Sequence, residues 1–220
     1  MTPDPPDPPS APRLVCFDLG GVIVRICRTW EEGCARAGLP LRGMERRDAT
    51  RGLRAAAVLD FQTGRIDAAA FARRISEAIG GDYSPEEVLA VHRAWVIDEY
   101  PGVVETIDRL HGMGLDTAAL SNTNEAHWAI IEGWPALRRI RRPHASHLMG
   151  LHKPDEAIYR AFERSVGFRG GEILFLDDLP ENVDAARAVG WHARQIDPHG
   201  DTAAQILEAV RASGAPRRSA

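Results

Sequence analysis

A carboxylate stands directly after the first apolar run of this sequence. Residues Leu14–Phe17 are apolar, Asp18 follows them, and Gly20 and Gly21 come next. Glycines let the backbone turn sharply and bring bare N–H groups, such as those of Leu19 and Gly20, close to an anion. A carboxylate beside exposed amides suits nucleophilic attack on a phosphoryl group, or metal binding. The same pattern also occurs as a plain strand followed by a tight turn.

Polar residues stand in comparable places later in the chain. One predicted strand ends at Ser121 and another at the pair Asp177–Asp178, while Lys153 opens a predicted helix. Because the carboxyl ends of parallel strands share one edge of a sheet, these side chains would converge with Asp18 there. A carboxylate nucleophile, a hydroxyl donor, a cation and a carboxylate pair for a metal would then form one site. Taken singly, each residue has a plainer explanation as a helix cap or a surface charge.

The rest of the chain predicts the elements that would hold these residues. From 25 to 100 the pattern is helical throughout, with helices over 29–39, 44–64, 66–81 and 84–95. From 101 onward helices alternate with apolar strands, which favours right-handed crossovers and a doubly wound parallel sheet. The predicted fold class is therefore α/β, with a four-helix cap inserted after the first strand.

Changes in composition predict the domain boundaries. The proline-rich residues 1–12 lack apolar periodicity and are expected to form a disordered arm. We expect a core over 13–24 and 101–213, the helical cap over 25–100 and a frayed tail over 214–220. Within the cap, Asp67 and Ser84 are suitable N-cap residues for the third and fourth helices.

The overall composition is that of an ordinary soluble globular protein, with 44% hydrophobic and 26% charged residues. A net charge of -4 gives no general affinity for nucleic acid or acidic membranes. No apolar run approaches the length of a membrane span, and the start of the sequence lacks the layout of a signal peptide. Cys16, Cys27 and Cys34 are too few for a disulfide framework or a zinc site. We therefore expect reduced thiols in a cytoplasmic protein that binds neither nucleic acid nor membranes.

Four motifs together resemble those of the haloacid dehalogenase-like hydrolases. They are FDLGGV at 17–22, LSNTN at 120–124, HKPDEAIY at 152–159 and FLDDLPENVDAA at 175–186. The resemblance covers residues 13 to about 196, and it implies a Rossmann-like core with a helical cap. The first two motifs look most like those of the bacterial α-D-glucose-1-phosphate phosphatases, which implies a small phosphorylated metabolite, such as a sugar phosphate, as the substrate.

The resemblance implies a phosphatase mechanism with named roles. Asp18 would attack phosphorus and form an aspartyl-phosphate that water then hydrolyses. Ser121, the amide of Asn122 and the ammonium of Lys153 would hold the phosphoryl oxygens, together with the loop amides of Leu19 and Gly20.

The resemblance also implies Mg²⁺ as a cofactor, because a carboxylate cannot easily approach a phosphate dianion. Mg²⁺ prefers oxygen ligands. Asp18, Asp178 and the carbonyl of Gly20 would supply them. Asp177 would belong to the same metal site, either orienting the ligands or holding Lys153.

One position departs from the pattern of most phosphatases in this family. They carry a second Asp, a general acid and base, where this sequence has Gly20. His152 is a candidate replacement, although a surface role for it is more ordinary. Two alternatives stay open: a metal-independent 2-haloacid dehalogenase, which resembles this sequence in lacking the second Asp, and a non-catalytic phosphate-binding protein. The retained pair Asp177–Asp178 favours a metal, and therefore a phosphate ester.

Overall fold

A five-stranded parallel sheet forms the centre of the computed structural model, which describes residues 11–43 and 48–215. The strands run in the order β5-β4-β1-β6-β7. Their bounds are β1 Leu14–Phe17, β4 Asp116–Ser121, β5 Arg142–Ala145, β6 Ile173–Asp177 and β7 His192–Gln195. Every pairing is parallel. The predicted α/β class and doubly wound sheet are therefore confirmed.

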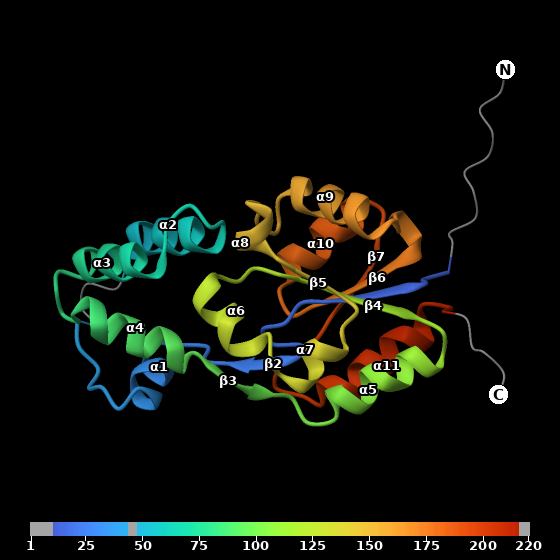
Figure 1. Ribbon diagram of the computed structural model, residues 1–220, viewed down its shortest axis with the longest axis horizontal. Helices are drawn as coiled ribbons and strands as arrows, with labels where there is room; N and C mark the ends of the chain where they lie inside the picture. The colour runs from blue at the N-terminus through green and yellow to red at the C-terminus, as the bar shows by residue number, and fades with distance from the viewer. Residues whose placement is uncertain (1–10, 44–47, 216–220) are drawn as a thin grey trace, which may run out of the picture.

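Helices cover both faces of the sheet (Figure 1). On one face lie α5 Val103–Gly112 and α11 Thr202–Ala212, and on the other lie α9 Glu156–Val166 and α10 Pro180–Ala188. Alternate residues of β1 supply the two cores: Val15 and Phe17 pack with α5 and α11, while Leu14 and Cys16 pack with α9 and α10. A central parallel strand buried on both faces has no polar side, which explains its continuous apolar run.

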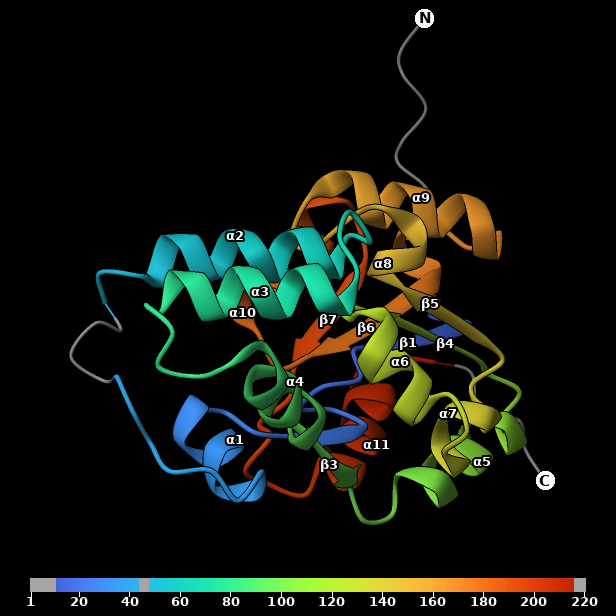
Figure 2. The ribbon, with the colours of Figure 1, turned by 60° about the vertical axis from the view of Figure 1, so that its left-hand side comes forward.

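Four helices form the cap at the end of the sheet toward which the strands run (Figure 2). They are α1 Trp30–Arg36, α2 Arg51–Gln62, α3 Ala68–Ala78 and α4 Pro85–Ala94. Asp67 accepts a hydrogen bond from the N–H of Ala70, and Ser84 forms a capping box with Glu87, so both predicted N-caps are confirmed. The cap has its own apolar core around Phe61, Phe71 and other buried residues of these helices.

The region from 25 to 100 is not helical throughout, which corrects the sequence prediction. β2 Val24–Ile26 and β3 Val96–Glu99 form an antiparallel ribbon where the chain enters and leaves the cap. Both strands are short and only partly buried, so neither shows the alternation that identifies a strand. The predicted strand over 144–150 is also wrong in its bounds, because β5 ends at Ala145 and α8 Ser146–Met149 follows.

Three short elements complete the described structure: α6 Glu125–Ile131, α7 Pro135–Arg139 and the 3₁₀ turn η2 Gly170–Glu172. None of the helices in the described ranges is both long and apolar enough to cross a membrane. The three cysteines are buried and free, as predicted. Most of the predicted arm (1–10), part of the second predicted helix (44–47) and most of the predicted tail (216–220) lie outside the described residues.

Candidate active site

The loop after β1 places a buried carboxylate beside unused backbone donors. Asp18 is 8% exposed, and its N–H donates to the carbonyl of Leu176 at 2.8 Å. The chain then turns back, and the carbonyl of Leu19 accepts hydrogen bonds from three N–H groups, including that of Val24 at 2.7 Å. Within residues 11–43 and 48–215, the N–H groups of Leu19 and Gly20 have no acceptor. These N–H groups are therefore unused donors beside Asp18, and their binding of an anion stays a prediction.

Gly21 allows two charged side chains to come close to this loop. Its φ is +86°, a conformation that glycine adopts readily. A Cβ atom at this position would lie 2.5 Å from Nη2 of Arg28 and 2.6 Å from Oδ2 of Asp178. Any other residue at position 21 would therefore collide with both side chains.

Three carboxylates gather at the carboxyl ends of β1 and β6. Asp18, Asp177 and Asp178 each have an oxygen within 4.8 Å of the others. Burial raises the pKa of Asp18 to about 6; Lys153 opposes this increase, and the two other carboxylates add to it. Oδ1 of Asp18 is buried without a well-aligned hydrogen bond, although the Lys153 ammonium lies 3.1 Å away. A buried oxygen short of partners in a cluster of carboxylates fits an oxygen-preferring divalent cation such as Mg²⁺.

Lys153 is the one lysine among the 27 lysine and arginine residues of the sequence, and its side chain is completely buried. Its Nζ lies 2.6 Å from Oδ2 of Asp177 and 5.1 Å from the centre of the Phe175 ring. Burial disfavours the ammonium, but Asp18 and Asp177 outweigh that cost and raise the pKa of Lys153. The prediction that Lys153 opens a helix is wrong. Lys153 lies in the turn before α9.

Asn122 fixes the backbone of this turn. Its Oδ1 accepts a hydrogen bond from the N–H of Lys153, and its Nδ2 donates to the Lys153 carbonyl, both at 2.9 Å. The backbone N–H of Asn122 has no acceptor among the described residues, so it is available to a ligand. Ser121, at the end of β4, is buried and close enough to Asp18 for its hydroxyl to lower the pKa of that carboxyl.

The two carboxylates after β6 differ in their partners. Asp177 accepts hydrogen bonds from the N–H of Leu179 at 2.9 Å and from Nδ2 of Asn182 at 3.1 Å, in addition to Lys153. Asp178 contacts Nη1 of Arg28 through Oδ2 at 2.6 Å, and burial raises its pKa. Asp177 is therefore occupied in holding Lys153, whereas the side-chain partner of Asp178 is Arg28.

Arg28 and Gln62 were not identified from the sequence as parts of the site. Arg28 follows β2, and only the fold brings its guanidinium to Asp178. Gln62, the last residue of α2, accepts a hydrogen bond from Nε2 of His152 at 2.9 Å. His152 also receives a long contact of 3.4 Å from Nδ2 of Asn122, so it joins the core to the cap.

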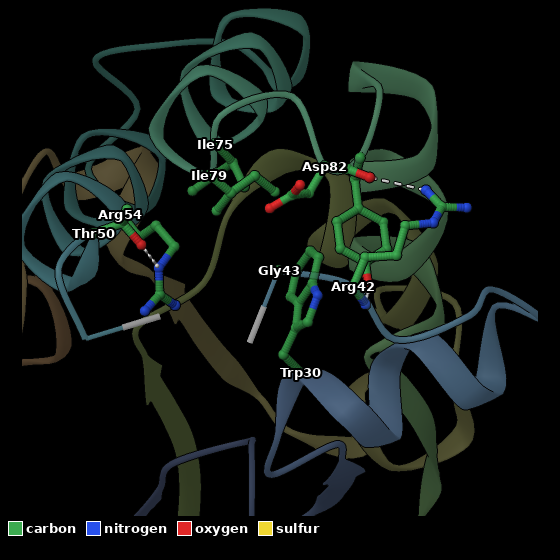
Figure 3. Close-up of a pocket in the computed structure, with 9 residues that line it drawn as sticks. Trp30, Arg42, Gly43, Thr50, Arg54, Ile75, Ile79 and Asp82 are labelled. Carbon is green, nitrogen blue, oxygen red and sulfur yellow. Dashed lines mark hydrogen bonds between the residues drawn. The ribbon is translucent and has the colours of Figure 1, made fainter. Parts of the chain in front are cut away.

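One cavity lies next to this site, and a smaller one lies farther into the cap. The larger, about 310 Å³, is enclosed by residues of the cap and by the start of α6, and Arg28, Gln62 and Asn124 are among its lining residues. The smaller, about 40 Å³, lies within the cap (Figure 3). Trp30 and Arg54 line both cavities, so they belong to a common wall.

The sequence matches a family model described as a haloacid dehalogenase-like hydrolase over residues 12–190. The chain therefore belongs to the haloacid dehalogenase-like hydrolases. This result confirms the resemblance at the level of the family and agrees with the parallel sheet and the carboxylate cluster described above. The narrower resemblance to α-D-glucose-1-phosphate phosphatases stays a prediction.

Two relatives show how far the similarity extends along the chain. Phosphatase MT3486 of Mycobacterium tuberculosis (strain CDC 1551 / Oshkosh) is 25% identical over 218 residues, which cover 91% of this chain and 94% of that protein. Acyl-CoA dehydrogenase family member 10 of Mus musculus is 32% identical over 117 residues. That alignment covers 52% of this chain and 11% of the mouse protein, so the chain corresponds to a small part of it.

Solved structures of the same family share the fold. The enzyme BT-2542 of Bacteroides thetaiotaomicron, in complex with magnesium and inorganic phosphate, has a TM-score of 0.72 and 22% identity, and the match covers 86% of this chain and 96% of that one. The L-2-haloacid dehalogenase of Xanthobacter autotrophicus has a TM-score of 0.61 and 17% identity, with 84% and 77% covered. At these identities the likeness concerns the fold.

We predict that Lys153→Met destabilises the protein by about 3–5 kcal/mol, because it leaves buried carboxylates without their counter-charge. Urea denaturation followed by circular dichroism measures the change. Adding Asp177→Asn should recover part of the loss, since the second change removes the uncompensated charge. Arg160→Met, at a surface ion pair, serves as the control and should change little. Wild-type stability of Lys153→Met would contradict the importance of this buried pair.

Proposed function

We propose that this hydrolase is a Mg²⁺-dependent phosphatase that cleaves a small phosphomonoester, such as a sugar phosphate, through an aspartyl-phosphate. The observation that carries the proposal is the buried Asp18 carboxylate, 3.1 Å from the Lys153 ammonium and beside the unused N–H groups of Leu19 and Gly20. An anionic nucleophile surrounded by donors and a fixed cation suits attack on a phosphoryl group whose oxygens need compensation.

The proposed reaction has two steps. In the first, a carboxylate oxygen of Asp18 bonds to phosphorus as the ester P–O bond breaks, and the departing oxygen takes a proton from water to give the alcohol. In the second, water attacks the aspartyl-phosphate, which restores Asp18 and releases inorganic phosphate. The hydroxyl of Ser121, the amide of Asn122 and the ammonium of Lys153 would hold the phosphoryl oxygens in both steps.

The residues that would hold Mg²⁺ are Asp18, Asp178 and the carbonyl of Gly20. When bound, the ion supplies positive charge between the carboxylates and the phosphate. Asp177 differs from them, because its oxygens already accept hydrogen bonds from Lys153, Leu179 and Asn182. Of the two roles that the resemblance implies for Asp177, we therefore assign it that of holding Lys153 in place, and not that of orienting the metal ligands.

The site favours phosphate chemistry over the two alternatives. A metal-independent dehalogenase has no need for a cluster of three buried carboxylates, two of which carry raised pKa values. A non-catalytic phosphate-binding protein has no need for a buried nucleophile, yet Asp18 and Lys153 are both retained and lie 3.1 Å apart. The name of the Mycobacterium tuberculosis relative, a phosphatase aligned over nearly the whole chain, supports the same proposal.

Asp18→Asn should abolish turnover while the fold stays intact, because an amide cannot form the acyl-phosphate. Phosphate release from a panel of sugar phosphates measures turnover, and trapping with hydroxylamine detects the phosphoenzyme. Circular dichroism and thermal unfolding establish that the variant is folded. Activity within tenfold of the wild type in a folded Asp18→Asn protein would rule out the covalent mechanism.

Activity should require Mg²⁺, and Asp178→Ala should raise the Mg²⁺ concentration needed for half-maximal activity by at least tenfold. Asp177→Asn is the matched comparison, and it should lower the maximal rate more than the affinity for Mg²⁺, because it releases Lys153. Calorimetric titration with Mg²⁺ gives the affinity independently of turnover. Full activity in excess EDTA would instead support the dehalogenase alternative.

Because Gly20 cannot donate a proton to the leaving group, the rate should fall as the leaving group becomes more basic. Aryl and anomeric phosphates should react faster than primary-alcohol phosphates such as glucose 6-phosphate. A Cβ atom at position 20 would lie 3.0 Å from Cδ1 of Ile26, so Ile26 occupies the space that an acid would need. Gly20→Asp combined with Ile26→Ala should therefore reduce the difference in rate between these two classes of ester more than Gly20→Asp alone does.

The measurement is kcat across a series of phosphate esters for the wild type, both Gly20→Asp proteins and Ile26→Ala alone as the control. Equal rates across the series in the wild type would show that another group already supplies the proton.

A further inference from the structure

The larger cavity contains a network of hydrogen bonds that joins the cap to the core. His92, near the end of α4, stacks on His127 of α6 with their ring centres 3.8 Å apart and their planes 10° apart. Both imidazoles, together with Asn124, line the cavity. Asn124 is the N-cap of α6, and its Oδ1 accepts a hydrogen bond from the N–H of His127 at 3.1 Å.

This network determines which ring nitrogens carry hydrogen. Nε2 of His127 lies 2.7 Å from the carbonyl oxygen of His92, and a carbonyl can only accept, so Nε2 of His127 donates. Nε2 of His92 lies 3.2 Å from Oδ1 of Asn124, which is an acceptor, so Nε2 of His92 also donates. Nδ2 of Asn124 faces Nδ1 of His127 at 3.4 Å, consistent with a lone pair on that nitrogen.

The remaining nitrogen, Nδ1 of His92, therefore presents a lone pair. It has no hydrogen-bond partner among the described residues, and it is not one of the buried side-chain atoms that lack both a partner and access to solvent. Burial and the neighbouring His127 lower the pKa of His92 to about 3, so the imidazole is neutral and its Nδ1 is an acceptor at physiological pH. His92 lines the cavity, so we infer that its Nδ1 is an acceptor that a molecule in the cavity can reach.

The rest of the lining limits what could meet this acceptor. Aromatic side chains form much of the wall, including the stacked pair Phe61 and Phe71, whose ring centres are 4.7 Å apart. Trp30 and Trp95 add two more flat surfaces. No carboxylate is present among the described lining residues, so no negative charge in the lining favours a cationic ligand. At about 310 Å³ it lies near the lower end of the range of small-molecule sites, about 300–1,000 Å³.

The cavity also adjoins the carboxylate cluster. Arg28 lines the cavity and lies 2.6 Å from Oδ2 of Asp178. Gln62 also lines it and contacts His152, the neighbour of Lys153. A molecule with its phosphate at Asp18 could therefore place the rest of its structure in this space.

We propose that the cavity binds the leaving group of the substrate, that this leaving group is a hydroxylated ring, and that one ring hydroxyl donates a hydrogen bond to Nδ1 of His92. The aromatic wall would contact the apolar face of the ring. This proposal rests on the proposed phosphatase function only in taking the ring to be the leaving group of a phosphate ester. His92 is then a specificity-determining residue, because an analogue without the hydroxyl leaves a polar atom of the cavity unpaired.

The test compares matched phosphate esters in two series. One contains phenyl phosphate with its hydroxyphenyl and methoxyphenyl analogues, and the other contains α-D-glucose 1-phosphate with its monodeoxy and mono-O-methyl analogues. A methoxy group keeps the oxygen but cannot donate. In at least one series the wild type should prefer one hydroxylated ester by about tenfold in kcat/KM over both the analogue without the oxygen and the methylated analogue. Equal values for the hydroxylated and methylated esters in both series would overturn the proposal.

His92→Phe keeps an aromatic ring in the stack but removes the acceptor. We expect it to reduce the tenfold preference to less than threefold. His144→Phe is the control, because His144 packs on Phe162 and bonds to Ser165, and it is not among the residues lining the cavity. It should keep the wild-type preference. An unchanged preference in a folded His92→Phe protein would overturn the role of His92.

Binding separates this proposal from the proposed phosphatase function. Calorimetry with the Asp18→Asn protein and Mg²⁺ gives Kd for each ester without turnover, and Asp18→Asn/His92→Phe gives the matching values without the acceptor. If no ester releases phosphate from the wild type but the hydroxylated ester still binds tenfold tighter through His92, the phosphatase function fails and the cavity proposal stands. If phosphate is released and neither Kd nor kcat/KM depends on the hydroxyl, the phosphatase function stands and the cavity proposal fails.

Discussion

The buried ion pair between Lys153 and Asp177 is the interaction on which the rest of the site depends. An ammonium with no exposure to solvent is costly unless carboxylates surround it, and here Asp177 lies at 2.6 Å and Asp18 at 3.1 Å. The pair brings the turn before α9 against the ends of β1 and β6. Asn122, which follows β4, then fixes the backbone of that turn through two hydrogen bonds to Lys153. The position of the ammonium therefore depends on three neighbouring strands.

A second constraint is the polar boundary between cap and core. Arg28 reaches Asp178, Gln62 reaches His152, and the stacked imidazoles of His92 and His127 share Asn124. Such contacts need particular distances and directions, whereas apolar contacts tolerate sliding. Several of the residues that position the cap also line the larger cavity. The shape of this cavity therefore depends on how the cap packs on the core.

The sequence was sufficient to predict the sheet and the convergence of Asp18, Lys153 and the pair Asp177–Asp178. Asp18 and the pair Asp177–Asp178 stand at the ends of strongly apolar strands, and parallel strands share one edge, so local patterns determine where these carboxylates lie. The α/β class followed from the alternation of helices and strands after residue 101. The helix was predicted to begin at Lys153, but α9 begins at Glu156, because Pro154 and the residues after it resemble a helix start.

Arg28 and His92 could not be identified in this way. Their roles depend on how the cap rests on the core, which no periodicity records, and an arginine or histidine in a polar segment looks like many others. The ribbon of β2 and β3 was missed for a related reason, since strands of three and four residues outside the main sheet leave too short a pattern. Long-range contacts, and not local preferences, determine these features.

The single lysine also makes this chain unusually easy to observe. Because every other basic side chain is an arginine or a histidine, feeding cells ¹⁵N-labelled lysine would mark one backbone amide, that of Lys153. This amide donates to Oδ1 of Asn122 inside the site. One nuclear magnetic resonance signal would then report on the ends of β1, β4 and β6 together, without any assignment of the remaining spectrum.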